Sequence, residues 1–236
     1  MQVTPIDNGF LYGLDAQHLI EFQGHLLEAS TAKALMQMQQ AAQKDGINIA
    51  ICSAYRDFDK QMQIWNLKAC GKRRLLDKNN QLVDANNLNA NDLIDTILIW
   101  SALPGTSRHH WGTDIDIFDS NCISQSDLRL VSDEYMPGGP CHALFNWMQS
   151  HAHKFGFYRP YQAGLSGVSP EPWHYSYYPS SHSLLKLFRT ADLALIINNH
   201  DLAVKQALAP RLPELVNQYV MKIAPAPDLH KQEQFL

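Results

Sequence analysis

The 236-residue sequence contains no apolar stretch that approaches the length of a membrane span, and it has no internal repeat. A spanning helix needs about 20 mainly apolar residues. Apolar residues make up 45% of the chain and charged residues 18%, a globular composition that excludes a disordered or fibrous protein. A chain of this length buries one substantial core or two small ones, so we expect a single domain with peripheral helices.

The chain also lacks a large excess of either charge. The formal net charge is -4, and no run of five or six like charges occurs, which excludes the basic face of a nucleic-acid-binding protein. The basic cluster Lys72–Arg74 precedes an Asn-rich stretch that ends at Asn91, and we interpret it as a solvated loop. We therefore expect neither a nucleic-acid partner nor a membrane span, and the sequence does not predict an oligomeric state.

No Cys-x-x-Cys pair occurs among the cysteines, which excludes a zinc ribbon and a thioredoxin-like redox motif; they are Cys52, Cys70, Cys122 and Cys141. A Cys122–Cys141 disulfide stays open and would need an oxidising compartment. Residues 1–17 lack the basic start and apolar core of a signal peptide. If Met1 is the natural start we expect a cytoplasmic protein, and otherwise a periplasmic or extracellular one.

Helical spacing of apolar residues and a terminal glycine predict a helix from about Leu26 to Lys44, followed by a buried strand over 47–52. Asp57 is a suitable N-cap for a helix over 58–69. Further expected helices cover about 92–103, 142–154, 180–208 and 212–223, and further strands cover 113–118, 157–161 and 173–178. This order predicts an α+β domain with a central, mainly antiparallel sheet flanked by helices.

One loop-to-strand segment, residues 107–116, combines imidazole and carboxylate groups. In the expected strand Asp114, Asp116 and Phe118 share a face, and a turn at Gly112 could fold a histidine back towards the carboxylates. The spacing alone leaves open whether that histidine is His109 or His110.

A second segment places Glu171 three residues before His174. Ideal strand alternation would put the two on opposite faces, so a turn at Pro172 is needed to bring them together. Two imidazoles and a carboxylate would then give a metal three protein ligands and leave a position for water, the arrangement of a catalytic zinc site.

These segments occur together with Ser53-x-Tyr55-Arg56-x4-Gln61. From about residue 27 to 178 the chain resembles the zinc D-alanyl-D-alanine carboxypeptidases and dipeptidases of vancomycin resistance (VanY and VanX type), whose fold is shared with the hedgehog signalling domain. The motifs that carry the resemblance are Ser-x-His-x-x-Gly-x-x-x-Asp on Ser107, His109, Gly112 and Asp116, and Glu-x-Trp-His on Glu171, Trp173 and His174.

The resemblance implies a Zn²⁺ cofactor held by His109, Asp116 and His174, because the histidine ligand of the family stands three residues before the glycine. It implies Glu171 as the catalytic base and Arg56 as the group that stabilises the oxyanion. Gln61 and Ser107 occupy positions that could bind the peptide or its terminal carboxylate, or could cap helices and turns instead.

Two further polar residues, His110 and Asp114, lie next to the expected ligands in the sequence. We expect His110 to be packed or hydrogen-bonded. Asp114 stands where the family often has alanine, and it either orients a ligand imidazole or is solvated.

The resemblance divides the chain into an N-terminal extension (1–25), a zinc peptidase domain (26–179), C-terminal helices packed on it (180–224) and a tail (225–236). It predicts hydrolysis of the C-terminal D-amino acid of a peptidoglycan-derived peptide. The alternatives are an L,D-carboxypeptidase, a dipeptidase or an endopeptidase on muropeptides, which pocket walls rather than metal ligands would distinguish. A non-catalytic, zinc-stabilised binding module would need neither Glu171 nor Arg56.

Overall fold

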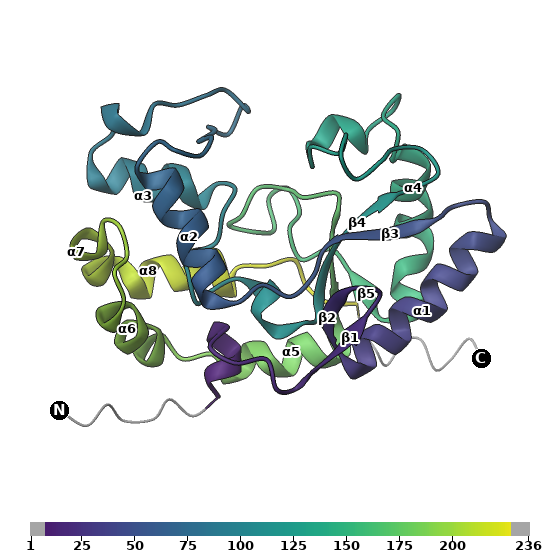
Figure 1. Ribbon diagram of the computed structural model, residues 1–236, viewed down its shortest axis with the longest axis horizontal. Helices are drawn as coiled ribbons and strands as arrows, with labels where there is room; N and C mark the ends of the chain where they lie inside the picture. Colours follow the sequence, from purple (N-terminus) through teal and green to yellow (C-terminus); the bar gives the residue numbers. More distant parts are fainter. Residues whose placement is uncertain (1–7, 228–236) are drawn as a thin grey trace.

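A four-stranded antiparallel sheet in the order β3-β4-β6-β5 lies at the centre of the molecule (Figure 1). The computed structural model describes residues 8–227, so the first residues of the N-terminal stretch and most of the expected tail lie outside it. The strands are β3 (Ile49–Ser53), β4 (Asp114–Asp119), β5 (Phe157–Tyr158) and β6 (His174–Tyr177). The sheet is flanked by helices, which confirms the predicted α+β fold class.

Helices α1 (Ala29–Lys44) and α4 (His142–His151) pack with the sheet and form what we call the sheet lobe. Their apolar stripes bury Leu35 and Leu144 in one cluster with Ile51, Ile115 and Ile117. The alternating isoleucines of β3 supply this core, as expected for a strand with one face turned towards helices.

A second core lies among helices on the other side of the molecule, which we call the helical lobe. It consists of α2 (Phe58–Ala69), α3 (Ala90–Leu98), α6 (Thr190–Asn199), α7 (Lys205–Leu208) and α8 (Leu212–Val216). Trp65 of α2 packs with Ile94, Leu193 and Leu215 in its centre. Helix α5 (Tyr178–Leu187) follows β6 and leads the chain from the sheet lobe into the helical lobe (Figure 1).

Several predicted boundaries were wrong. The helix expected from about Leu26 begins at Ala29, because 25–28 form strand β2 (His25–Glu28), which pairs with β1 (Leu19–Phe22). The Glu28 carboxylate then caps α1 by accepting from the backbone N–H groups of Ser30 and Thr31. A glutamate at this position gave a weaker start signal than the usual Ser, Thr, Asp or Asn.

The helix expected over 180–208 is divided into α5, α6 and α7, since the backbone is extended at Phe188 and Arg189 and left-handed at Val204 (φ 56°). The helix expected over 92–103 begins at Ala90 and ends at Leu98. The last expected helix is α8 followed by a π-turn (Asn217–Met221). The short 3-10 helices are Gly9–Tyr12, Ala85–Asn87, Arg108–Trp111, Ser132–Glu134, Ala152–Phe155 and Ala209–Arg211.

All four cysteines are free thiols in the structure. Cys122 is exposed, whereas Cys141 is buried and accepts a hydrogen bond from the Asp119 backbone N–H. The basic cluster Lys72–Arg74 is exposed, in agreement with the predicted solvated loop. Across residues 8–227, every helix is too short or too polar to cross a bilayer.

Candidate active site

The pairing of β4 with β6 brings two of the predicted metal ligands side by side. Asp116 lies directly opposite His174 in the antiparallel register, and Asp114 lies opposite Ser176. Directly opposed side chains share a face of the sheet. His174 Nδ1 is consequently 3.1 Å from Asp116 Oδ1, and both residues are buried.

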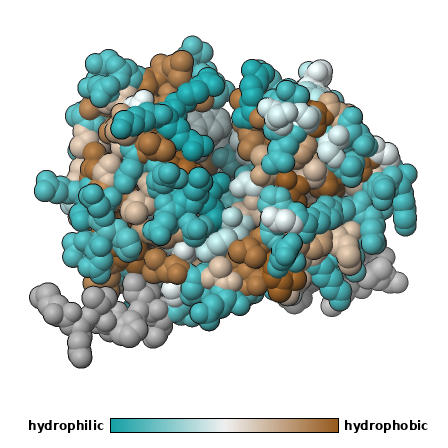
Figure 2. All heavy atoms as spheres, in the orientation of Figure 1, coloured by the Kyte–Doolittle hydropathy of each residue, from teal (hydrophilic) through white to brown (hydrophobic). Residues whose placement is uncertain are grey.

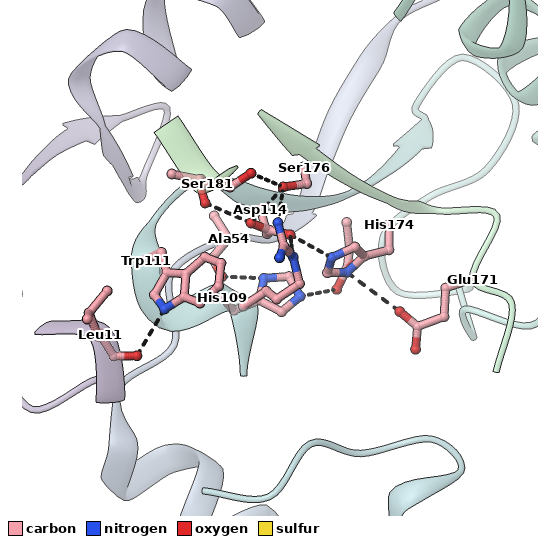
Figure 3. Close-up of polar contacts among 12 residues, drawn as sticks. Leu11, Ala54, His109, Trp111, Asp114, Glu171, His174, Ser176 and Ser181 are labelled. Carbon is pink, nitrogen blue, oxygen red and sulfur yellow. Dashed lines mark hydrogen bonds and ion pairs between the residues drawn. The ribbon is translucent and has the colours of Figure 1, made fainter. Parts of the chain in front are cut away.

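The third predicted ligand reaches this point from the 3-10 helix Arg108–Trp111. Gly112 closes that helix with φ 68°, where a Cβ would stand 2.4 Å from Leu19 Cδ2, so only glycine fits. The turn places His109 Nε2 3.3 Å from Asp116 Oδ2. Its other ring nitrogen, Nδ1, lies 2.8 Å from the carbonyl oxygen of Ala54 (Figure 3).

These three residues fit a metal site. Potential ligand atoms of His109, Asp116 and His174 all lie within 4.8 Å of one another. The Ala54 carbonyl accepts the Nδ1 proton of His109, which leaves the Nε2 lone pair directed towards Asp116. Asp114 Oδ1 lies 3.0 Å from Nε2 of His174 and accepts its proton, which leaves Nδ1 free on the same side. Both imidazoles are thus held in a tautomer that can bind a metal ion.

Asp114 is not solvated, because it is the centre of a buried network behind His174. Its carboxylate accepts from Arg108 Nε (2.8 Å), Thr113 Oγ1 (2.7 Å) and Ser176 Oγ (3.1 Å) as well as from His174. Burial alone would raise the pKa of Asp114, but the charge of Arg108 and these hydrogen bonds hold it below its usual range. Asp114 therefore orients His174 as a charged partner, one of the two roles considered from the sequence.

His110 points away from this centre. Its ring is fully buried, Nδ1 lies 2.6 Å from the carbonyl oxygen of Arg56, and Nε2 accepts from the backbone N–H of Gly105 at 3.2 Å. Burial lowers the pKa of His110 to about 3, so the ring is neutral. With both nitrogens occupied by backbone groups, His110 has no lone pair for a metal, and the packed role expected for it is observed.

The turn at Pro172 brings Glu171 to the same centre, as its sequence position required. The backbone N–H of His174 donates to the Glu171 carbonyl, and Glu171 Oε2 lies 3.5 Å from His174 Nδ1 (Figure 3). Burial raises the pKa of Glu171 to about 7, although the His174 ring opposes the shift whenever it is protonated. A carboxyl group with this pKa can take up and release a proton near neutrality.

Arg56 lies on the connection between β3 and α2, at the border of the two lobes. Its Nη1 donates to Gln61 Oε1 at 2.8 Å, and its Nη2 donates to Ser53 Oγ at 3.3 Å. The Gln61 amide nitrogen in turn donates to the Ala102 carbonyl at 2.7 Å. Gln61 is thereby held in place, and its amide oxygen fixes the Arg56 guanidinium. Ser107 is 3% exposed, and its hydroxyl makes no hydrogen bond within residues 8–227.

Two residues of the site were missed by sequence reasoning. Arg108 lies next to the expected ligand, and Ser176 lies two residues after His174; both hold Asp114, and Arg108 Nη2 also donates to Ser176 Oγ at 2.6 Å. Strand alternation would have placed Ser176 on the face of His174. Arg108 gave no signal of its own, because its partner lies six residues away across the Gly112 turn.

The site lies between the two cores. Asp116 and His174 come from the sheet lobe, and Arg56 is fixed by Gln61 of α2 in the helical lobe. Figure 2 shows the surface hollowed between the lobes, with hydrophilic side chains along the hollow. A molecule bound in this hollow could contact side chains of both lobes.

Comparison with known proteins agrees with this geometry. The VanY family, described as D-alanyl-D-alanine carboxypeptidase, matches residues 24–180. A D-alanyl-D-alanine carboxypeptidase of Enterococcus faecalis is 25% identical over 171 residues, which cover 70% of this chain and 54% of that protein. The chain thus spans about half the length of that relative. An uncharacterized protein of Haemophilus influenzae is 34% identical over 108 residues, which cover 44% of this chain and 72% of that protein.

Solved structures share the fold. A mutant of the VanY D,D-pentapeptidase from a VanB-type vancomycin resistance cassette, in complex with Zn(II), has a TM-score of 0.51 at 23% identity and covers 83% of this chain and 93% of its own. VanYB in complex with D-alanine-D-alanine has a TM-score of 0.52 at 23% identity, with 83% and 92% covered. Because the family match covers residues 24–180, more than half of the chain, the chain belongs to the VanY family of D-alanyl-D-alanine carboxypeptidases.

Proposed function

We propose that this protein is a zinc-dependent carboxypeptidase that removes the C-terminal D-amino acid from peptidoglycan-type peptides ending in D-alanyl-D-alanine. The observation that carries the proposal is the convergence of His109 Nε2, His174 Nδ1 and the Asp116 carboxylate beside Glu171. Family membership supports the carboxypeptidase class, and the substrate is inferred from what the family description names.

The donor set favours zinc. Two neutral imidazoles and one carboxylate suit this ion, and three protein ligands leave a position for water. When bound, zinc would supply a Lewis acid that polarises the scissile carbonyl and lowers the pKa of water. His109, Asp116 and His174 would hold it, and the Ala54 carbonyl and Asp114 would keep the imidazoles in the correct tautomer.

The remaining steps belong to side chains of this chain. Glu171 takes a proton from the attacking water and delivers it to the departing amine, which its position next to the ligand cluster and its partial exposure of 14% allow. Arg56, fixed by Gln61 and Ser53, places a guanidinium where negative charge develops on the carbonyl oxygen. A donor already fixed by the protein needs little reorganisation during the reaction.

The same observations argue against a non-catalytic binding module. Holding a metal needs the three ligands and their partners, but it needs neither a carboxyl group with a raised pKa beside them nor a braced arginine. Both are present: Glu171 lies beside His174, and Arg56 is braced by Gln61 and Ser53.

The test combines metal analysis with product release. We expect about one zinc per purified chain. A diacetyl-L-lysyl-D-alanyl-D-alanine peptide should release D-alanine, and a chelator should abolish that release until zinc is restored. Matched peptides with an L,D-terminal bond, a free dipeptide and an internal D,D-bond distinguish the alternative peptidase activities.

Full activity in the metal-free protein would refute zinc dependence. Release from the L,D peptide alone would refute the D,D assignment while leaving the metal chemistry intact. A zinc-loaded protein that cleaves none of the four peptides would favour a binding module.

A further inference from the structure

The buried face of α2 carries an unexpected cation. Most of its buried residues are apolar, but Gln61 and Lys68 are buried as well. They are seven positions apart in the sequence, which places both on the same side of the helix, two turns apart. Gln61 contacts Arg56, so this side of α2 faces the candidate active site.

Lys68 has no bonded partner there. Its side chain is 9% exposed, and within residues 8–227 its ammonium group makes neither a hydrogen bond nor an ion pair with a carboxylate. Lysine is almost never buried to this degree unless it is paired. The second cation nearby, Arg73, is exposed and repels Lys68.

The acidic residue that interacts electrostatically with Lys68 is Glu171. The two charges attract, and Lys68 lowers the pKa of Glu171 while Glu171 raises that of Lys68. They do not form an ion pair within 4.0 Å. Lys68 is therefore near enough to Glu171 for their charges to interact, and its ammonium group is left without a direct partner in the described part of the chain.

We propose that Lys68 binds a carboxylate of the peptide substrate, namely the free C-terminal carboxylate next to the scissile bond. This inference rests on the proposed function. Lys68, a residue of α2 outside the metal cluster, would then give the preference for substrates with a free C-terminus. The enzyme would cleave as a carboxypeptidase rather than as an endopeptidase.

The experiment compares the diacetyl-L-lysyl-D-alanyl-D-alanine free acid with its C-terminal carboxamide. The zinc-loaded wild-type protein should prefer the acid, and Lys68→Met should lower kcat/KM for the acid by about tenfold to a hundredfold, the range expected for loss of a hydrogen bond to a charged group. Most of the change should lie in KM, and the amide should change little. Methionine keeps the length of the side chain and removes its charge.

Lys60→Met is the matched control. Lys60 lies on the same helix but is exposed, and its ammonium donates to Gln63. This variant should keep the wild-type ratio between acid and amide. An equal loss for both peptides in Lys68→Met would overturn the proposal, because it would show a structural role or an effect on Glu171.

Calorimetric titration in a Glu171→Gln background measures binding without turnover. Tighter binding of the acid than of the amide, abolished by adding Lys68→Met, would support the proposal. Equal affinities before Lys68 is changed would overturn it, even if the Lys68 variant does not fold. If the wild-type protein cleaves neither peptide, the proposed function fails, but these affinities still decide whether Lys68 binds a carboxylate.

Discussion

The two sides of the active site differ in how completely their polar groups are paired. On the sheet side, His109, Asp114 and His174 are buried and satisfied by fixed partners, apart from the atoms that face the proposed metal. On the helical side, Arg56 is half-buried and Lys68 has no bonded partner among the described residues. A metal site needs preset geometry, whereas a substrate site needs groups that a ligand can still satisfy.

Replacing each of the two adjacent histidines by alanine should give the largest effects on the sheet side. His109→Ala should lose zinc and activity together, and His174→Ala should do the same. His110→Ala should keep the metal but lose stability by about 2–5 kcal/mol, because it removes a buried ring and two hydrogen bonds. Elemental analysis and denaturant unfolding measure the two effects. Equal zinc loss at His109 and His110 would contradict the assignment of the ligand.

Glu171 separates catalysis from metal binding. Glu171→Ala should retain zinc and lose at least about a hundredfold in turnover, the usual scale for a general base. Steady-state kinetics on a zinc-loaded sample, with metal content measured in parallel, gives the result. Loss of the metal in this variant would make Glu171 a ligand instead of the base.

Asp114 connects the metal cluster to the buried arginine behind it. Asp114→Asn should weaken zinc affinity by about tenfold to a hundredfold, as expected when the partner of a ligand imidazole is changed. It should also destabilise the fold by about 3–5 kcal/mol, because Arg108 is left without its counter-ion. Chelator competition measures the zinc affinity, and unfolding curves measure the stability.

A double change isolates the effect on zinc. Arg108→Gln combined with Asp114→Asn removes both charges and should recover part of the stability but not the zinc affinity. Recovery of full zinc affinity in the double variant would show that Asp114 acts through folding alone.

On the helical side, Arg56→Lys should lower kcat with a smaller change in KM. Lysine keeps the charge, but it cannot donate to Gln61 and Ser53 at once as the guanidinium does. Kinetics on a folded, zinc-loaded variant separates the two constants. A rise in KM alone would mean that Arg56 binds the substrate equally in the ground and transition states.

The smallest expected effect is a pH dependence of the preference for the free acid. Burial and the charge of Arg73 lower the pKa of Lys68 to about 8, with Glu171 opposing the shift. Only the protonated amine attracts a carboxylate, so the preference should be constant below about pH 7 and decline above about pH 8. Titration of Glu171 should affect kcat/KM for the acid and the amide equally, so the ratio of the two values removes its contribution. A flat ratio up to pH 9.5 would exclude Lys68 as the carboxylate-binding group.

Sequence reasoning predicted which residues come together at the candidate metal centre because its parts obey local rules. Strand alternation placed Asp114 and Asp116 on one face, and Gly112 and Pro172 marked the turns that bring His109 and Glu171 to them. Helix α2 was predicted with its observed boundaries, since Asp57 is a strong cap. The choice between His109 and His110 needed the resemblance to a family, because both can fold back from the same turn.

What the sequence did not reveal depends on contacts between distant segments. The neutral, packed state of His110 comes from the Arg56 carbonyl and the Gly105 N–H. Lys68 resembles any lysine near a helix end until the helical lobe buries it. The helix expected over 180–208 was too long because its breaks are backbone turns without proline or glycine, which carry little local signal.

The 3-10 helix Arg108–Trp111 has a further consequence. Nδ1 of its two histidines contacts the carbonyl groups of Ala54 and Arg56, and the Arg56 N–H donates to the His109 carbonyl. The spacing between His109 and the Arg56 backbone is therefore set by one main-chain hydrogen bond and two contacts between a histidine ring and a carbonyl group. Because these contacts lie outside α2, substitutions in α2 or in the loop that follows it can alter the hollow while the spacing between His109 and the Arg56 backbone is retained.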